Sequence, residues 1–256
     1  MIPRWLDTLL SSPSSRISSH YLAYKDWRWG DPHLHLLRHL YRSDKIAIDI
    51  GAHRGEYTYF LQRASRACIA FEPNPMLAEI LRRRFPRGVV VLPHAVSDQR
   101  GVRILRIPIF DGEEHLSKAT IDTANEFEQS RDITVDTVRL DDLALTDVGL
   151  LKIDVEGHEK SVLDGAIETI RREKPNLIVE LEERYHPGIT KQAADLLDDL
   201  GYRGVFLWNG KMLPQRLFKP EVHQKLYDGQ PRAPYAWNFV FTTDDALLAR
   251  ISGWTR

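Results

Sequence analysis

The sequence predicts an α/β fold in which helices pack on a mostly parallel sheet. Short apolar runs alternate along the chain with longer amphipathic stretches, which is the pattern of strand–helix–strand units with right-handed crossovers. Runs such as Leu177–Val179 are apolar throughout, as expected for strands buried on both faces. Acidic residues and glycines directly follow several of these runs, and an open parallel sheet binds its ligand at that edge.

The chain has 256 residues, of which 43% are hydrophobic and 28% charged, so it is long and apolar enough for one large domain with appendages. The formal net charge is −1 and no long basic run occurs, which argues against nucleic acid as the main partner. No run of about 18 apolar residues is present, so we predict no membrane-spanning helix. The single cysteine, Cys68, lies in an apolar run and fits a reducing, cytoplasmic location.

We divide the chain into an N-terminal helical extension, residues 1–43, and one larger domain, residues 44–256. In the extension, a serine-rich patch at 11–15 predicts a turn between two short helices. Asp31 and Pro32 predict the start of a further helix that runs to about Arg42, because a capping carboxylate followed by proline is typical of a first helical turn.

The apolar runs of the larger domain predict the strands of its sheet. In chain order they are Ile46–Ile50, Ala67–Phe71, Val89–Leu92, Leu150–Ile153, Leu177–Leu181, Tyr202–Leu207 and Phe239–Thr242. Alternation over Val102–Ile107 predicts an exposed additional strand, and Thr134–Val138 is a candidate for another. The amphipathic stretches between the runs predict helices over Glu56–Ala64, Pro75–Phe85, His158–Arg171 and Lys191–Leu200. Gly201 follows the last of these as a C-terminal cap.

The first predicted strand ends in an acid, Asp49, and turns through Gly51 and Gly55 into a helix. Gly51 lets the backbone approach a ligand closely, and Gly55 permits a tight entry into the helix. The N-terminus of that helix offers free N–H groups to an anion such as the carboxylate of an amino acid. A glycine turn alone is also compatible with a plain connection.

Glu72 directly follows the second predicted strand. An acid about 20 residues after the glycine turn is placed to accept hydrogen bonds from both hydroxyls of a ribose. Together with the turn, it predicts a nucleoside-containing cofactor. A nicotinamide-dependent oxidoreductase would use the same acid, but the turn lacks the Gly-x-Gly-x-x-Gly pattern and carries His53 where a pyrophosphate needs close backbone approach.

Three acids and a histidine crowd the end of the Leu150–Ile153 strand: Asp154, Glu156, His158 and Glu159. Such crowding is costly unless a ligand, a cation or a reaction uses it. Some of these side chains are equally suited to cap the following helix.

These three segments together resemble the FkbM-type methyltransferase family, over about residues 47–183, and 238–241 is similar to the family's closing strand. The resemblance implies a Rossmann-like methyltransferase fold, a seven-stranded mostly parallel sheet with its last strand antiparallel and helices on both faces. It also implies S-adenosylmethionine as methyl donor, S-adenosylhomocysteine as product, and O-methylation of hydroxyls on sugars, macrolides or related metabolites.

The resemblance further implies roles for individual residues. Asp49, Gly51 and Gly55 would hold the methionine half of the cofactor, Glu72 the ribose, and Ala95, Val96 and Ser97 the adenine. Asp154 would lie near the methionine ammonium and the transferred methyl group. The cofactor set is completed by His53, Tyr57, Thr58 and Pro73. The family usually has asparagine where this chain has His53.

For an in-line transfer to oxygen, a base that removes the hydroxyl proton assists the reaction. His158 is the first candidate, because an unperturbed histidine titrates near neutrality, and Asp154 is the second. Glu156, Glu180 and Glu182 are candidates for contacts with the acceptor. Their carboxylates also suit magnesium or calcium, but nothing in their spacing requires a metal, and we predict none.

The acceptor is predicted to be a small molecule or a saccharide. Residues 111–132 are a candidate lid or wall over it, and the N-terminal helices a candidate cover or homodimer contact. A catalytically silent module with a cofactor fold is an alternative from another class, but the intact acids at the strand ends argue against it.

Overall fold

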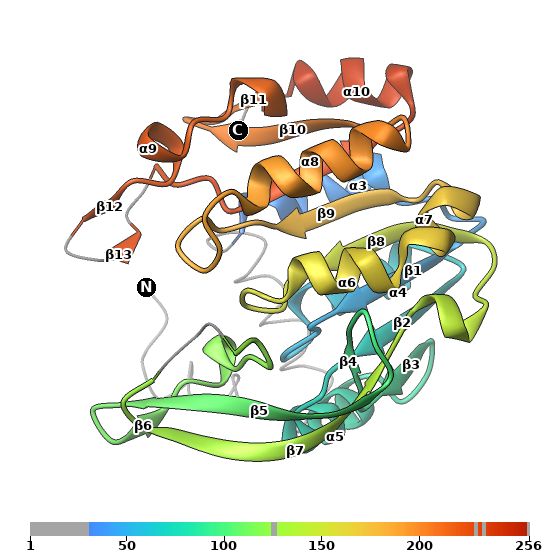
Figure 1. Ribbon diagram of the computed structural model, residues 1–256. Helices are drawn as coiled ribbons and strands as arrows, with labels where there is room; N and C mark the ends of the chain where they lie inside the picture. The colour runs from blue at the N-terminus through green and yellow to red at the C-terminus, as the bar shows by residue number, and fades with distance from the viewer. Residues whose placement is uncertain (1–30, 124–126, 228–229, 232–233, 255–256) are drawn as a thin grey trace, which may run out of the picture.

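The computed structural model describes residues 31–123, 127–227, 230–231 and 234–254. The two helices predicted around residues 11–15 lie outside these ranges. The described part is built on one large sheet with helices on both faces (Figure 1). From edge to edge the sheet consists of β11 (Lys211–Pro214), β10 (Arg203–Trp208), β14 (Asn238–Thr242), β9 (Asn176–Glu180), β8 (Val148–Ile153), β1 (Ile46–Ile50), β2 (Ala67–Phe71) and β3 (Val89–Leu92).

The strand directions confirm the predicted class. Strands β3, β2, β1, β8 and β9 pair in parallel, and β14 is antiparallel to both of its neighbours, β9 and β10. The predicted strand count of seven is wrong by one, because β11 pairs with β10 as a hairpin. Asn209 and Gly210 form its two-residue connection with φ of +49° and +75°, and Asn-Gly is the sequence that such a turn favours.

Alternate residues of the central strands serve two separate cores. Ile48, Leu151 and Val179 pack against α6 (Glu159–Gly165), α7 (Ile167–Glu173) and α8 (Ile189–Asp199). Ala47, Leu150 and Ile178 face the opposite core, which contains side chains of η1 (Pro32–His35), α3 (Leu37–Leu40), α4 (Glu56–Ala64) and α10 (Asp245–Ser252). This two-sided burial explains why the strand sequences are apolar throughout.

Two helix predictions needed correction. The helix predicted over His158–Arg171 is broken at Ala166, where φ is −116°. Asp141 of η3 (Asp141–Leu143) accepts the backbone N–H of Thr169 at 2.8 Å, so a side chain caps the first turn of α7. The helix predicted from Pro32 to Arg42 begins as expected, with Asp31 accepting the His33 N–H at 2.8 Å, but it consists of the short η1 and α3. The division at residue 43 stays a prediction.

A smaller sheet lies below the large one (Figure 1). It consists of β4 (Ala95–Val96), β7 (Ser130–Val138), β5 (Gly101–Phe110) and β6 (Glu113–Glu114). The predicted strands at Val102–Ile107 and Thr134–Val138 are parts of its long antiparallel β5–β7 pair. Leu105, Ile121 and Val135 pack together against this sheet. The segment with η2 (Leu116–Lys118) is thereby held close to the carboxyl ends of the large sheet.

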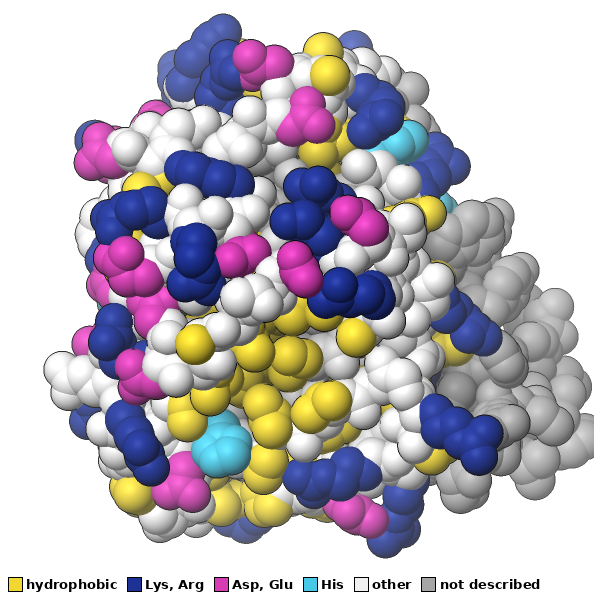
Figure 2. Space-filling view, turned by 90° about the vertical axis from the view of Figure 1, so that its right-hand side faces the viewer, with side chains coloured by type: hydrophobic (Ala, Val, Ile, Leu, Met, Phe, Trp, Pro, Cys, Tyr) yellow, Lys and Arg dark blue, Asp and Glu magenta, His cyan; other side chains and the backbone are white. Residues whose placement is uncertain are grey.

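The remaining short elements are α5 (Pro75–Arg84), α9 (Pro220–His223), η4 (Gln215–Leu217) and the β12–β13 pair (Leu226–Tyr227 and Gln230–Pro231). No helix in the described ranges is both long and apolar enough to span a bilayer. On the face shown in Figure 2, basic and acidic side chains are interspersed over the upper part, and hydrophobic side chains gather below around a histidine. This interspersion fits the near-neutral net charge.

Candidate active site

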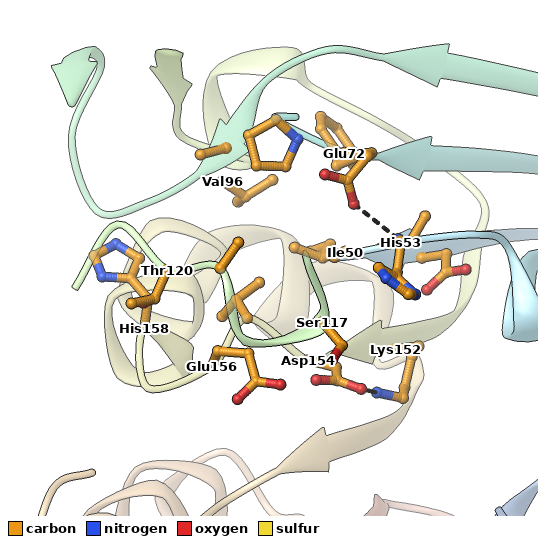
Figure 3. Close-up of a pocket in the computed structure, with 18 of the residues that line it drawn as sticks. Ile50, His53, Glu72, Val96, Ser117, Thr120, Lys152, Asp154, Glu156 and His158 are labelled. Carbon is orange, nitrogen blue, oxygen red and sulfur yellow. Dashed lines mark hydrogen bonds and ion pairs between the residues drawn. The ribbon is translucent and has the colours of Figure 1, made fainter. Parts of the chain in front are cut away.

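A cavity of about 290 Å³ opens at the carboxyl ends of β1, β2, β8 and β9. Its wall is completed by residues 94–96 and by Leu116, Ser117, Ala119, Thr120 and Ile121 of the segment after β6. Part of the predicted lid, residues 111–132, therefore does border the cavity. Figure 3 shows Glu72 and Val96 on one side, with Asp154 and Glu156 across from them. This is the edge at which an open parallel sheet binds its ligand.

The turn after β1 requires glycine at position 51, because the backbone that follows β8 packs directly against it. Gly51 has a φ of +81°, and a Cβ there would lie 1.8 Å from the carbonyl oxygen of Asp154. The N–H groups of Gly51 and Ala52 both donate to the Phe71 carbonyl at 3.0 Å. Gly51 thus holds the ends of β1, β2 and β8 together, in addition to lining the cavity.

Gly51→Ala is expected to lower the melting temperature by about 10 °C or to prevent folding, since a severe clash adds to the cost of about 1–2 kcal/mol for a left-handed non-glycine residue. Gly112→Ala is the matched control, because Gly112 also has a positive φ, +78°, but has nothing within 4 Å of the added Cβ. That control is expected to lose only about 2–4 °C. Thermal unfolding followed by circular dichroism measures both, and equal losses would contradict the packing role of Gly51.

Asp49 is buried at the end of β1, where the Thr58 hydroxyl donates to its carboxylate at 2.5 Å. Burial raises the pKa of Asp49 to about 6, although the Thr58 hydrogen bond and the Lys152 charge act in the opposite direction. Asp49 reaches the cavity, whereas Thr58 lies behind it and is fully buried.

Glu72 is anchored by two backbone groups at the end of β2. Its Oε2 accepts the His53 N–H at 2.8 Å, and its Oε1 accepts the Asn74 N–H at 2.9 Å (Figure 3). Glu72 is only 6% exposed, and burial raises its pKa to about 7 despite these hydrogen bonds. His53 therefore contributes its backbone to the site, while its ring lies 3.7 Å from Glu56.

Asp154 forms an ion pair with Lys152, whose Nζ donates to Oδ2 at 2.7 Å (Figure 3). Burial acts to raise the pKa of Asp154, but the Lys152 charge and hydrogen bonds from Glu180 and Lys152 lower it below its ordinary value. Burial and the Asp154 charge raise the pKa of Glu180 well above its ordinary value and so favour its protonated form.

Glu156 faces the same cavity from the loop before α6, with a φ of +54°. The Tyr185 hydroxyl donates to its Oε2 at 2.5 Å. Burial and the nearby Asp154 charge raise the pKa of Glu156 to about 8. Carboxylate oxygens of Asp154, Glu156 and Glu180 lie within 4.8 Å of one another. The absence of a metal from this group stays a prediction.

His158 caps the start of α6 and is 9% exposed. Its Nε2 lies 2.9 Å from the Ser97 hydroxyl, and its Nδ1 lies 3.7 Å from Asp122. Burial lowers the pKa of His158 from its ordinary value, against the opposing charges of Asp122 and Asp98. Burial therefore favours the uncharged ring. Asp122 also contacts His186 Nε2 at 3.0 Å, so it joins the wall segment to the loop before α8.

The region that builds this cavity is also the region that matches a known protein family. The family model described as the methyltransferase FkbM domain matches residues 49–203, which is more than half of the chain. The chain belongs to the FkbM methyltransferase family. Its family match begins at the acid that ends β1 and extends into β10.

One curated protein and one solved structure are similar to this chain. Methyltransferase sdnD of Sordaria araneosa is 29% identical over 194 residues, which cover 62% of this chain and 74% of that protein. The crystal structure of the FkbM methyltransferase from Methylobacillus flagellatus KT superimposes with a TM-score of 0.50 at 16% identity. That superposition covers 92% of this chain but only 57% of the other, and it supports the fold.

Most of the predicted site residues of this FkbM-family chain meet at the cavity. Those that line it are Asp49, Gly51, His53, Tyr57, Glu72, Pro73, Ala95, Val96, Asp154, Glu156, His158 and Glu180. Four others support it from behind or lie beside it: Gly55, Thr58, Ser97 and Glu182. Gly55 begins α4 with a φ of +86°, and the Glu182 carboxylate accepts a hydrogen bond from Arg184 at 2.6 Å. The functional role of each of these residues stays a prediction.

Three charged cavity residues were missed at the sequence level: Lys152, Asp31 and Glu56. Lys152 stands alone among apolar neighbours in β8, and a charge in a fully buried strand was the signal that could have revealed it. Asp31 was interpreted only as a helix cap. Its carboxylate also accepts the Tyr57 hydroxyl and, at 2.8 Å, the side-chain amide of Asn238.

Asp31 brings the N-terminal segment into the site. Although burial acts to raise its pKa, the His33 charge and hydrogen bonds from His33 and Tyr57 lower it to about 2. Asp31 is therefore an anion on the cavity wall. Asp31 and Asn238 both lie outside residues 49–203, so the site extends beyond the matched family domain.

Proposed function

We propose that this FkbM-family chain transfers a methyl group from S-adenosylmethionine to a hydroxyl oxygen of a saccharide or another small metabolite, with S-adenosylhomocysteine as product. The observation that carries the proposal is Glu72. Both of its carboxylate oxygens are fixed by backbone N–H groups at the end of β2, beside the Gly51 turn. Each oxygen keeps a free lone pair, so the two oxygens together suit the adjacent hydroxyls of one ribose.

The rest of the cavity fits the same cofactor. Pro73, Ala95 and Val96 are apolar residues in the cavity wall, and Figure 3 shows Val96 on the side of Glu72. Such a wall suits an adenine. Asp154 and Asp31 are the anions that would face a cationic amino-acid end. When bound, this cofactor supplies an activated methyl group on a sulfonium, so the protein has mainly to orient the acceptor and exclude water.

The chain's own residues then have to bind the acceptor and take up its proton. We propose His158 as the base, because it lines the cavity and burial lowers the pKa of its ring, which favours the uncharged form that can accept a proton. Glu156 and Glu180 are proposed to hold acceptor hydroxyls across the cavity from Glu72. Asp154 is a weaker candidate base, because its pKa is lowered by Lys152 and Glu180.

The pH dependence of turnover separates His158 from Glu156, whose raised pKa makes it an alternative base. A base works only when unprotonated, so activity is lost as the pH falls through its pKa. With His158 as base, turnover at saturating substrates is expected to be kept at neutral pH and to fall only in the acidic range, since burial lowers that pKa from its ordinary value. With Glu156 as base, the loss would begin near pH 8. A rate profile from pH 5 to 9 therefore assigns the role, and a midpoint near 8 would reject His158.

Calorimetry with S-adenosylhomocysteine and with NAD tests the proposed cofactor class. We expect S-adenosylhomocysteine to bind and NAD not to bind. The opposite result would favour a nicotinamide-dependent oxidoreductase. Labelled S-adenosylmethionine is then offered with nucleotide sugars, oligosaccharides and macrolides. Binding without transfer to any member of a broad acceptor panel would favour a catalytically silent module.

A further inference from the structure

Lys152 is a fully buried cation in the middle of the large sheet. It lies on β8, opposite Asp49 of β1 and Ile178 of β9, and is 1% exposed. Its Nζ donates to Asp154 at 2.7 Å and lies 4.8 Å from the centre of the Tyr57 ring. Burying an ammonium is costly unless it is paired. Its position on the cavity wall therefore calls for a specific use.

Lys152 is also the sole lysine or arginine among the described residues that line the cavity. The acids that line the cavity include Asp49, Asp154, Glu156 and Glu180. Among these four acids, only Asp154 has a pKa below its ordinary value, and the Lys152 charge is the main cause. The ammonium thus selects which carboxylate of a crowded group carries the negative charge, and its hydrogen bond holds that carboxylate in place.

We propose that Lys152 is a positioning residue that fixes Asp154 as the anion receiving the ammonium of the ligand's amino-acid end. This inference rests on the proposed function. Lys152 has three donors and no acceptor, so it cannot bind that ammonium itself and acts through Asp154. Without the Lys152 charge, Asp154 would share protons with Glu180 and present a weaker, less ordered acceptor.

The test compares two ligands that differ in the amino-acid end. S-adenosylhomocysteine has it, and 5′-methylthioadenosine lacks it but keeps the adenosine. Lys152→Met is expected to weaken the binding of S-adenosylhomocysteine by about 10-fold or more, which corresponds to the loss of one charge-assisted hydrogen bond. The same substitution is expected to change the affinity for 5′-methylthioadenosine by less than about 2-fold. Lys152→Gln, which keeps a donor but no charge, is expected to show the same selective loss.

Asp154→Asn and the double variant Lys152→Met/Asp154→Asn complete the cycle. Because Lys152 acts through Asp154, the double variant is expected to bind S-adenosylhomocysteine no more weakly than Asp154→Asn alone. Lys160→Met is the matched control, since Lys160 pairs with Asp164 on the surface of α6, and it is expected to match wild type with both ligands.

These measurements separate a failure of the Lys152 positioning role from a failure of the proposed function. Unchanged affinities in both Lys152 variants, or equal losses for the two ligands, would overturn the positioning role, because a purely structural defect does not single out the amino-acid end. A wild-type protein that binds neither ligand would instead reject the proposed function.

Discussion

Glu72→Ala is expected to weaken S-adenosylhomocysteine binding by at least about 100-fold. The change removes both acceptors proposed for the ribose hydroxyls, and each hydrogen bond to a charged group contributes about 1.5–3 kcal/mol. It also leaves the N–H groups of His53 and Asn74 without their acceptor, so the turn between β1 and α4 loses a fixed point. Calorimetry of the variant and of wild type measures the loss.

Glu79→Ala is the matched control, because Glu79 lies on exposed α5 in an ion pair with Arg83. It should leave affinity unchanged. The pH dependence of binding gives a second check. Burial raises the pKa of Glu72 to about 7, whereas ribose hydroxyls favour the ionised form, so wild-type affinity should decrease below pH 7. If Glu72→Ala bound S-adenosylhomocysteine as tightly as wild type, the proposed contact between Glu72 and the cofactor would be wrong.

His158→Ala is expected to lower turnover by about 10²–10⁴-fold, the usual contribution of a general base. Affinity for S-adenosylhomocysteine should stay within a few-fold of wild type, because the proposed ribose and ammonium contacts involve other residues. Single-turnover rates with labelled S-adenosylmethionine and an acceptor from the screen measure the chemical step apart from product release.

Glu156→Gln is the comparison for His158→Ala. Glutamine keeps the size of the side chain and still accepts the hydrogen bond from Tyr185, but it cannot take up a proton. If His158 is the base, this variant affects mainly the KM for the acceptor. A large loss of turnover in Glu156→Gln together with normal turnover in His158→Ala would exchange the two roles.

The sequence predicted the region around the site well because its signals there are local. Strand β1, helix α4 and strands β2 and β3 begin and end at the predicted residues. Parallel pairing then brings Asp49, Glu72 and Asp154 to one edge, since the carboxyl ends of parallel strands meet there. The strand-end acids could therefore be placed in one cavity without knowledge of any distance.

The errors arose where distant residues decide the local structure. The break between α6 and α7 involves Asp141, which caps α7 from another part of the chain, and Gly165 at the end of α6 was the local signal that could have indicated it. Asp31 already had a complete explanation as a helix cap, so its contacts with Tyr57 and Asn238 were not anticipated. Lys152 was hidden by its apolar neighbours, and only the fold shows which carboxylates surround it.

A crystal structure of the protein with S-adenosylhomocysteine is the most direct measurement. The account predicts that the ligand occupies the cavity beyond β1 and β2, with its ribose hydroxyls within hydrogen-bond distance of the two Glu72 oxygens. A ligand bound elsewhere, or a ribose that does not contact Glu72, would contradict it.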